Sequence, residues 1–423
     1  MHFSNLAKRC CKQSPYEEYL KILHKCESEP YSLEYPENTI LLNSAECTTN
    51  WKLFIDKYEH FYQLHEQDNR YGNYEGRQYL LNSLSKFLST YVYQTNVSSN
   101  ELVCTCGSGA AFELLTSCIC DEGDAILVIT PAYFAFERDL TLKTNTCLYY
   151  VDTHSSNFKI TDEQLENTYQ HVLNDGKEAR MLVFTNPSNP VGVVYSEEEM
   201  RIILSFCRRH DIHIFSDEVY ALSVEESNSN GFISFSKLIE NDPIQDDVTI
   251  HWGLSKDFGL PGFRFASLFT HNKELLDYMK NLNYLYEIPS VAQSVISNML
   301  EDDEFIQLHL KCYIQTVSKE RQHMQNFFKE HNIPFYRNNA SFFLYIDLSS
   351  YLKEKTFENE MELCLYLCKQ GKVLLSPGKS FYSQTPGWFR IVFTKNSHEV
   401  TALGLERLIN ALQSWEYHTS VSL

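Results

Sequence analysis

The segment S-K-D-F-G-L-P-G-F-R, from Ser255 to Arg264, carries three side chains with complementary chemistry. It directly follows an apolar run at 248–252 that predicts a strand. The amine of Lys256 can form a Schiff base with an aldehyde. The guanidinium of Arg264 follows across a turn with glycine and proline and suits a phosphate group, and Ser255 adds a hydroxyl. This set indicates a phosphorylated aldehyde that is held covalently.

Pyridoxal phosphate is such an aldehyde, and its other requirements can be sought in the sequence. Its ring nitrogen must stay protonated to act as an electron sink, which requires a carboxylate at the C-terminal end of a strand. Asp217, in I-F-S-D-E-V-Y, meets that requirement, although a helix N-cap is the alternative. Tyr220 and Asn189, the latter in the turn N-P-S-N-P-V-G, are placed to donate to the phenolic oxygen of the ring. We expect pyridoxal 5'-phosphate as the cofactor, with Lys256, Asp217 and Tyr220 as catalytic residues.

A glycine turn, C-G-S-G-A-A, joins a predicted strand to an apolar helix at 110–120. The backbone amides of Ser108, Gly109 and Ala110 are expected to face an anion there, with the positive end of the helix dipole behind them. Any strand-to-helix connection can use such a turn, so the motif is weak by itself. Beside the Schiff-base lysine, it predicts the phosphate site.

Two further side chains complete the candidate set. Tyr133, in T-P-A-Y after the next strand, is expected to stack on the cofactor ring, and a packed surface aromatic is the alternative. Arg390, in P-G-W-F-R-I-V-F, projects from a predicted strand and offers a fixed fork for a substrate carboxylate. A solvated arginine is the alternative for Arg390.

From about residue 77, helix-like and strand-like segments alternate, which is typical of helices that cover a mostly parallel sheet. The predicted fold class is therefore α/β: a large domain with a mostly parallel, seven-stranded-type sheet covered by helices, plus a smaller α+β domain built from both chain ends. We assign residues 66–309 to the large cofactor domain, and residues 1–65 with 310–423 to the small domain. The predicted strands of the large domain lie at 101–106, 125–129, 181–185, 212–216 and 248–252.

Within these domains, some helices have clear signals. Ser196 and Glu199 form a capping box that predicts the start of a helix. In the small domain, the sequence predicts a polar helix at 318–329, a strand at 341–348 and a terminal helix from about residue 397.

The composition limits the partners. Among 423 residues, 36 Lys and Arg stand against 55 Asp and Glu, and the net charge of −19 argues against nucleic acid or an anionic membrane as a partner. No apolar run reaches the roughly 18 residues of a membrane helix, and we expect no signal peptide. The 13 cysteines form no C-x-x-C pair and indicate reduced thiols in a cytoplasmic protein. His210 and His213 are read as a helix end and a strand, so we expect no metal.

In this order, the motifs resemble those of the fold-type I pyridoxal-phosphate enzymes of aminotransferase class I/II. The segments S-K-D-F-G-L-P-G-F-R, A-Y-F-A-F-E-R-D-L and S-P-G-K-S-F with P-G-W-F-R look specifically like 1-aminocyclopropane-1-carboxylate synthases and their animal synthase-like homologues. The resemblance spans residue 36 to the C-terminus, roughly. It implies Lys256 as the Schiff-base lysine, Arg390 as the ligand of the substrate α-carboxylate, and cofactor contacts at Ser108, Gly109, Tyr133, Asn189, Asp217, Tyr220, Ser255 and Arg264.

The resemblance also implies a homodimer with two shared active sites. In Y-G-N-Y-E-G, either Tyr71 or Tyr74 matches a tyrosine that reaches the phosphate of the neighbouring subunit's cofactor, and the spacing does not decide which. The synthases carry a glutamate-asparagine pair near the N-terminus, and this sequence keeps Glu46, a candidate substrate ligand, but has Cys47 for the asparagine. The cofactor set therefore looks intact while the substrate set is altered.

Two smaller departures concern the cofactor turns. Gly253 replaces a serine often found two residues before the Schiff-base serine, and Phe134 stands where proline usually follows the stacking tyrosine.

We expect an enzyme that acts on a small amino acid by Schiff-base exchange and removal of the Cα proton by Lys256. Transamination or C–S lysis ranks first because the asparagine beside Glu46 is missing. The alternatives are a true 1-aminocyclopropane-1-carboxylate synthase and a non-catalytic homologue that acts as a binding protein. The complete lysine, aspartate and arginine set counts against the last of these.

Overall fold

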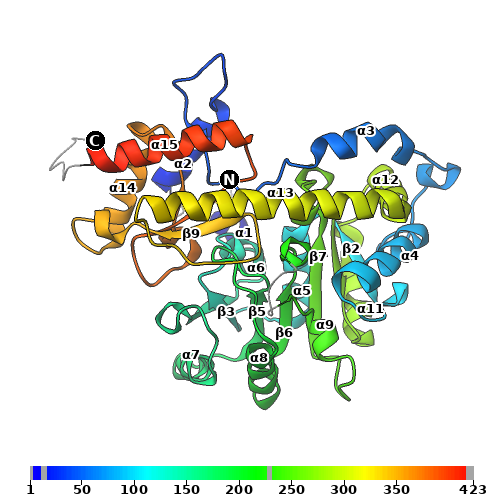
Figure 1. Cartoon of the computed structure of the whole chain (residues 1–423). Helices are drawn as coiled ribbons and strands as arrows, with labels where there is room; N and C mark the ends of the chain where they lie inside the picture. Colours follow the sequence, from blue (N-terminus) through cyan, green and yellow to red (C-terminus); the bar gives the residue numbers. More distant parts are fainter. Residues whose placement is uncertain (1–2, 11–16, 226–230, 416–423) are drawn as a thin grey trace.

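The computed structural model describes residues 3–10, 17–225 and 231–415, and its centre is a seven-stranded sheet (Figure 1). The strand order is β2-β8-β7-β6-β5-β3-β4. All neighbours are parallel except β8, which runs antiparallel to both β2 and β7. The strands are β2 (Leu102–Thr105), β3 (Ala125–Thr130), β4 (Cys147–Asp152), β5 (Ala179–Thr185), β6 (His213–Asp217), β7 (Val248–Gly253) and β8 (Ala266–Phe269).

This sheet and the smaller second domain confirm the predicted fold class. The inner strands β3, β6 and β7 are almost wholly buried because helices cover both faces of the sheet. Strands β4 and β8 were not among the predicted strands. Strand β4 lies at the edge of the sheet and is only half-buried, and β8 has four residues that directly follow the turn carrying Arg264.

One of the covering helices, α8, begins as predicted. The Ser196 hydroxyl accepts from the amide of Glu199 at 3.2 Å, and the Glu199 carboxylate accepts from the amide of Ser196 at 2.9 Å. Its apolar face is buried through Met200, Ile203, Leu204, Phe206 and Cys207. The helices of this domain include α4 (Gln78–Phe87), α5 (Ser108–Ile119), α6 (Phe136–Thr141), α7 (Asp162–Asn174), α8 (Glu197–Arg209), α9 (Phe235–Leu238), α11 (Lys273–Leu282) and α12 (Ser290–Glu301).

The second domain has its own core, to which both chain ends contribute. Tyr19 and Ile40 pack in one cluster with Phe343 and Ile391. A three-stranded antiparallel sheet has the order β11-β12-β9, and β1 pairs in parallel with β10. The elements are α2 (Glu17–Ser28), β1 (Ile40–Leu41), β9 (Phe343–Asp347), α14 (Phe357–Lys369), β10 (Val373–Leu374), β11 (Ser376–Pro377), β12 (Trp388–Val392) and α15 (His398–Ser414).

One long helix, α13 (Asp303–Glu330), runs past both domains (Figure 1). Its first turns place Phe305 and Ile306 in the core of the large domain, whereas Tyr313, Val317 and Met324 belong to the small-domain core. The predicted helix at 318–329 is therefore only the last part of a 28-residue element. The sequence contains no glycine or proline between 303 and 330 that would break the helix.

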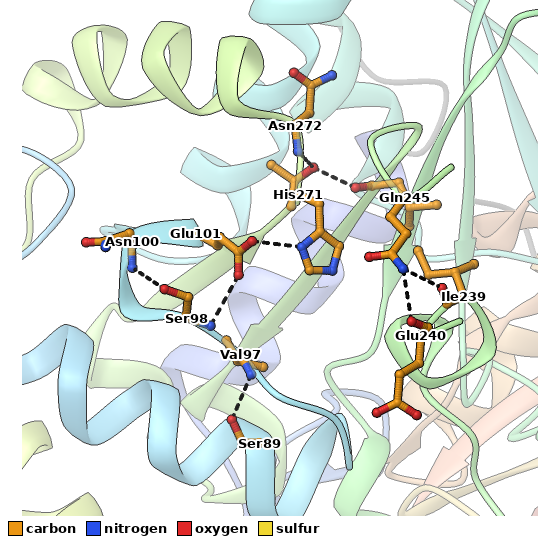
Figure 2. Close-up of polar contacts among 12 residues, drawn as sticks. Ser89, Val97, Ser98, Asn100, Glu101, Ile239, Glu240, Gln245, His271 and Asn272 are labelled. Carbon is orange, nitrogen blue, oxygen red and sulfur yellow. Dashed lines mark hydrogen bonds and ion pairs between the residues drawn. The ribbon is translucent and has the colours of Figure 1, made fainter. Parts of the chain in front are cut away.

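Polar side chains fix the loops at the edge of the sheet beside β2 and β8 (Figure 2). Nδ1 of His271 lies 2.8 Å from Oε1 of Glu101, which precedes β2. The other carboxylate oxygen of Glu101 accepts from the amide of Ser98 at 3.2 Å, and the Ser98 hydroxyl accepts from the amide of Asn100 at 3.3 Å. The entry to β2 is thus tied to the exit from β8.

The cysteines that the structure describes are free thiols, and the Sγ atoms of Cys26 and Cys368 lie 3.4 Å apart. His210 contacts Glu166 of α7 and His213 contacts Thr249 of β7, so the two histidines have different partners. Within the described ranges, no group of His, Cys, Asp and Glu is suited to hold a metal ion, and no helix is long and apolar enough to cross a membrane.

Candidate cofactor and substrate site

Lys256 lies on α10 (Leu254–Asp257), the short helix that follows β7 directly. Its Nζ donates to the backbone oxygen of Ala45 at 2.7 Å. Burial and the charge of Arg390 lower the pKa of Lys256 to about 8, while Glu46 and Asp217 act in the opposite direction. A larger share of the amine is therefore neutral near neutral pH than for an exposed lysine, as a nucleophile or base requires.

Gly253, the last residue of β7, has a packing reason in this chain. A Cβ at this position would lie 2.8 Å from the backbone oxygen of Phe265. Glycine therefore lets β7 approach the start of β8 closely, just before Lys256. The departure noted in the sequence reflects this close contact between two strands.

Asp217 ends β6 and is buried at the edge of the sheet where the parallel strands end. Its Oδ1 lies 2.7 Å from Nδ1 of His251, and its Oδ2 accepts from the hydroxyl of Thr185 at 3.1 Å. His251 comes from β7 and is fully buried, with its ring 4.9 Å from the ring of Phe112. Both oxygens of Asp217 are thus held in place from the two neighbouring strands.

Arg390, on β12, is a residue of the second domain that lies at the same site as Lys256. Its guanidinium donates to Oδ1 of Asn189 at 2.8 Å and to the backbone oxygen of Asn43, and its Nε has no partner among the described residues. Its charge lies 4.7 Å from the ring centre of Phe381 and 5.3 Å from that of Phe343. Burial lowers the pKa of Arg390. A buried cation with an unused donor is suited to bind a carboxylate.

The start of α5 and Arg264 form a cradle of donors. Gly107 precedes Ser108 with φ of 104°, and a Cβ on Gly107 would lie 2.5 Å from Nη2 of Arg264. The guanidinium therefore lies against the turn, beside the amides of Ser108, Gly109 and Ala110 at the helix N-terminus. Such an arrangement favours an anion through both the amides and the fork of the arginine.

Asp139, which no sequence motif indicated, lies beside this cradle. A Cβ on Gly109 would lie 3.4 Å from its carboxylate. Burial raises the pKa of Asp139 to about 6, and Arg138 and Arg264 oppose that rise. The cradle thus contains one acidic group that can bind a proton near neutral pH.

The two aromatic candidates occupy different positions. Tyr133 is half-buried and packs edge-on against Phe136 at 5.5 Å, whereas Tyr220 is fully buried and contacts Phe343 at 5.4 Å. Burial raises the pKa of both phenols, so each stays protonated and is able to donate a hydrogen bond. The peptide bond between Asn189 and Pro190 is cis.

A cavity of about 890 Å³ connects several of these groups. Its lining includes Lys256, Asn189, Arg390, Tyr133, Glu46 and Asn43. Glu46 is half-exposed and lies 3.5 Å from Nζ of Lys395. Ser255 is nearly buried next to Lys256, and Phe134 lines the outer part of the cavity with half of its surface exposed. The cavity also extends to α2, through Tyr19, Leu20 and Leu23.

Tyr71 and Tyr74 are not among the residues that line this cavity. Tyr71 is completely exposed, whereas Tyr74 keeps 44% of its surface exposed and packs edge-on against Tyr284 at 5.3 Å. The two tyrosines that the sequence left as alternatives therefore differ clearly in solvent exposure.

The fold and the site together define the class of this protein: it is a fold-type I pyridoxal-phosphate protein of the aminotransferase kind. A family model for aminotransferase class I and II matches residues 37–408. The chain therefore belongs to the aminotransferase class I and II family, which uses pyridoxal 5'-phosphate.

Relatives of known name lie among the 1-aminocyclopropane-1-carboxylate synthases. The chain is 31% identical over 344 residues to "1-aminocyclopropane-1-carboxylate synthase 2" of Solanum lycopersicum, covering 80% of this chain and 70% of the relative. It is 31% identical to "1-aminocyclopropane-1-carboxylate synthase-like protein 1" of Takifugu rubripes over 84% of this chain and 58% of that protein. It is also 30% identical to the "Probable inactive 1-aminocyclopropane-1-carboxylate synthase-like protein 2" of Mus musculus, over 84% of this chain and 62% of that protein.

Solved structures agree in fold. An aspartate aminotransferase double mutant of Thermus thermophilus superposes with a TM-score of 0.78 at 17% identity, covering 97% of this chain and all of the other. A Thermotoga maritima aspartate aminotransferase gives 0.79 at 20% identity, with the same coverage. At this identity the likeness speaks for the fold alone.

Proposed function

We propose that the protein is an enzyme that uses pyridoxal phosphate to act on an α-amino acid, as a transaminase or a C–S lyase. The observation that supports it is the meeting of Lys256, Asn189 and Arg390 in one cavity, from two domains. When bound, pyridoxal phosphate supplies an aldehyde for the substrate amine and a ring that takes up the electrons released at Cα.

In this proposal each side chain has a distinct task. Lys256 would hold the aldehyde. Once the substrate amine has displaced it, the freed amine of Lys256 would remove the Cα proton, for which a lowered pKa of about 8 is suitable. Asp217, held by His251 and Thr185, keeps a proton on the ring nitrogen. Asn189 and Tyr220 bind the phenolic oxygen, Tyr133 stacks on the ring, and the phosphate is bound by Ser108, Gly109, Ala110, Ser255 and Arg264.

The substrate is proposed to lie between the two domains. Arg390 binds its α-carboxylate through the fork that Asn189 and Asn43 orient. Glu46 lies at the cavity wall and is placed to contact the distal part of the substrate. We further propose a homodimer in which Tyr71, which is fully exposed in the single chain, reaches the phosphate bound by the partner.

Two other functions have support from the relatives. The named synthases favour formation of 1-aminocyclopropane-1-carboxylate, and the relative with "inactive" in its name favours a binding protein without turnover. The retained Lys256, Asp217 and Arg390 argue against the second, and Cys47 beside Glu46 argues against the first.

The first experiment asks whether the purified protein binds pyridoxal phosphate through Lys256. We expect a visible absorbance band that Lys256→Ala abolishes, together with all turnover, because among the described residues that line the cavity Lys256 is the only lysine. A colourless protein that does not take up added cofactor would refute the proposal.

The second experiment identifies the reaction. A panel of amino acids and S-adenosylmethionine is incubated with the holoenzyme, and keto acid, methylthioadenosine, ammonia and pyruvate are measured in the same samples. Keto acid formed only with an amino acceptor indicates transamination, and ammonia with pyruvate indicates lysis. Methylthioadenosine as the sole product would contradict both and would identify the protein as a synthase.

A further inference from the structure

The residue after Lys256 is a buried aspartate whose side-chain partners lie outside the lining of the cavity. Oδ2 of Asp257 accepts from the amide of Leu222 at 3.0 Å and lies 3.4 Å from the indole Nε1 of Trp252. Its Oδ1 lies 3.4 Å from the hydroxyl of Tyr313. The carboxyl group therefore joins α10 to the turn that follows Tyr220, to β7 and to α13.

The backbone of Asp257 is anchored as well. Nε2 of His309, on α13, donates to the backbone oxygen of Asp257 at 3.0 Å. The assignment of this proton follows from Asn50, whose Nδ2 donates to Nδ1 of His309 at 3.2 Å. Burial lowers the pKa of His309 to about 4, so the ring is neutral, and it stacks on Phe258 at 4.4 Å. The end of α10 is thus attached to α13 at two points.

The turn next to Tyr220 is held from the same side. This turn, η5 (Ala221–Ser223), provides the Leu222 amide for Asp257. The backbone oxygen of Ser223 accepts from Arg321 of α13 at 3.2 Å, and its hydroxyl accepts from the amide of Ser341 at 2.8 Å. Asp257 therefore links α10, which carries Lys256, to the turn that follows Tyr220.

We propose that Asp257 is a positioning residue, which holds α10 and the turn after Tyr220 in one geometry against α13 and thereby places Nζ of Lys256. The inference rests on the proposed function, in which Lys256 binds pyridoxal phosphate. Small displacements matter at such a site, because a misplacement of about 1 Å can cost about 100-fold in rate. Asp257 itself touches neither cofactor nor substrate in this proposal.

The test compares Asp257→Leu with Asp257→Asn by the pH titration of the bound cofactor's absorbance band, which needs no substrate. Leucine has a similar shape but accepts no hydrogen bond, so α10 would be held less firmly in its position. Lys256 would then lie farther from Arg390 and be more exposed to water. Burial and the charge of Arg390 both disfavour a positive charge on the Lys256 nitrogen that would carry the cofactor. A displaced Lys256 should lose part of both effects, so we expect the titration midpoint of the band to rise, by about one unit. Asparagine can still accept from Leu222 and Trp252 and donate to Tyr313, so its midpoint should stay at the wild-type value.

Tyr313→Phe is the second variant, because it removes only the hydrogen bond between α13 and the Asp257 carboxyl group and preserves the packing of the ring. We expect a smaller rise of the titration midpoint in Tyr313→Phe than in Asp257→Leu. If Asp257→Leu does not fold, the midpoint of Tyr313→Phe alone tests the positioning role. Glu199→Leu is the matched control, since this carboxylate also accepts backbone amides, from Ser196 and Ile160, but in α8. It should lower stability and leave the midpoint unchanged.

The outcomes separate the two proposals. If wild-type protein shows no cofactor band, the proposed function fails. If wild-type shows the band but Tyr313→Phe and Asp257→Leu titrate like wild-type, only the positioning role fails. A midpoint that moves equally in Glu199→Leu would also overturn it, because the shift would then reflect lost stability in general.

Discussion

Asp217 owes its fixed position to two neighbours of different chemistry. His251 offers a ring nitrogen at 2.7 Å and Thr185 a hydroxyl at 3.1 Å. All three side chains are buried, so water cannot easily replace a partner that is lost. In the described part of the chain, the second ring nitrogen of His251 has no partner, and Asp217 is therefore the polar contact that orients this histidine.

The variant His251→Phe tests this contact. Phenylalanine keeps an aromatic ring beside Phe112 but removes the donor to Oδ1 of Asp217. The carboxylate then loses one of the two contacts that fix its position, so it should hold the ring nitrogen of the proposed cofactor less well. We expect a loss of about 10- to 100-fold in kcat/KM near neutral pH.

Thr185→Val is the matched control for His251→Phe. It removes a neutral hydroxyl donor from the other oxygen of Asp217, which is worth only about 1 kcal/mol. Its loss of kcat/KM should be smaller than that of His251→Phe. An unchanged kcat/KM in both variants would show that Asp217 does not depend on these partners.

For single residues, the sequence predicted those site residues that belong to a recognisable local motif. Lys256 and Arg264 share one motif, and Asp217 closes a strand-like run. Contacts between distant segments were not predictable: Asn189 and Arg390 are separated by 201 positions. His251 was missed because a histidine inside an apolar strand resembles any core residue until its partner is known.

Among the elements, the edge strand β2 and its neighbour β8 depend on the polar cluster of Figure 2. Burial tends to raise the pKa of Glu101, but the hydrogen bond and charge of His271 outweigh it, so the pKa lies below the usual value of 4.5. A carboxylate with a lowered pKa stabilises the fold above its unfolded pKa. That contribution is lost as the pH falls through the lower, folded value.

The variant His271→Ala should therefore be less stable than wild-type at pH 6 by about 0.5–1 kcal/mol. The difference should shrink as the pH falls below 4.5, where Glu101 becomes protonated in the unfolded chain and then in the folded one. Urea unfolding at several pH values measures this difference. If the gap stays constant down to pH 3.5, the contact does not depend on the charge of Glu101.

The elements that the sequence missed share physical reasons. Strand β4 is half-buried on an edge and β8 spans four residues, so neither has a long periodic pattern. The first half of α13 was missed because its buried residues face two different cores, which blurs a single apolar stripe. The start of helix α8, whose capping box is explicit in the sequence, was predicted to the residue.

For the whole molecule, the contrast between global and local charge is the main feature. The chain carries a net charge of −19, yet Lys256 and Arg390 line one cavity and Arg264 lies at the nearby helix terminus. The acidic surface repels polyanions, while the local cations suit a phosphate and a carboxylate on small molecules. The net charge therefore predicts the class of partner only in combination with the fold, which shows where the cations Lys256, Arg390 and Arg264 lie.

In the proposed homodimer, the exposed Tyr71 would contact the phosphate held by the partner. The hydroxyl of a fully exposed tyrosine contributes little to stability, so Tyr71→Phe should unfold like wild-type. If it binds the phosphate held by the partner, the variant should bind pyridoxal phosphate about tenfold more weakly. Tyr74→Phe is the matched control, and an equal loss in both variants would contradict the assignment to Tyr71.

The exposure of Tyr71 also has a consequence for mixtures of defective chains. Lys256→Ala removes the amine from a chain's own site, whereas Tyr71→Ala damages the site of its neighbour. In a mixed dimer of the two, one site carries both defects and the other carries none. At a cofactor concentration too low to saturate Tyr71→Ala, the two preparations exchanged together through mild dissociation should therefore show more activity than either preparation alone.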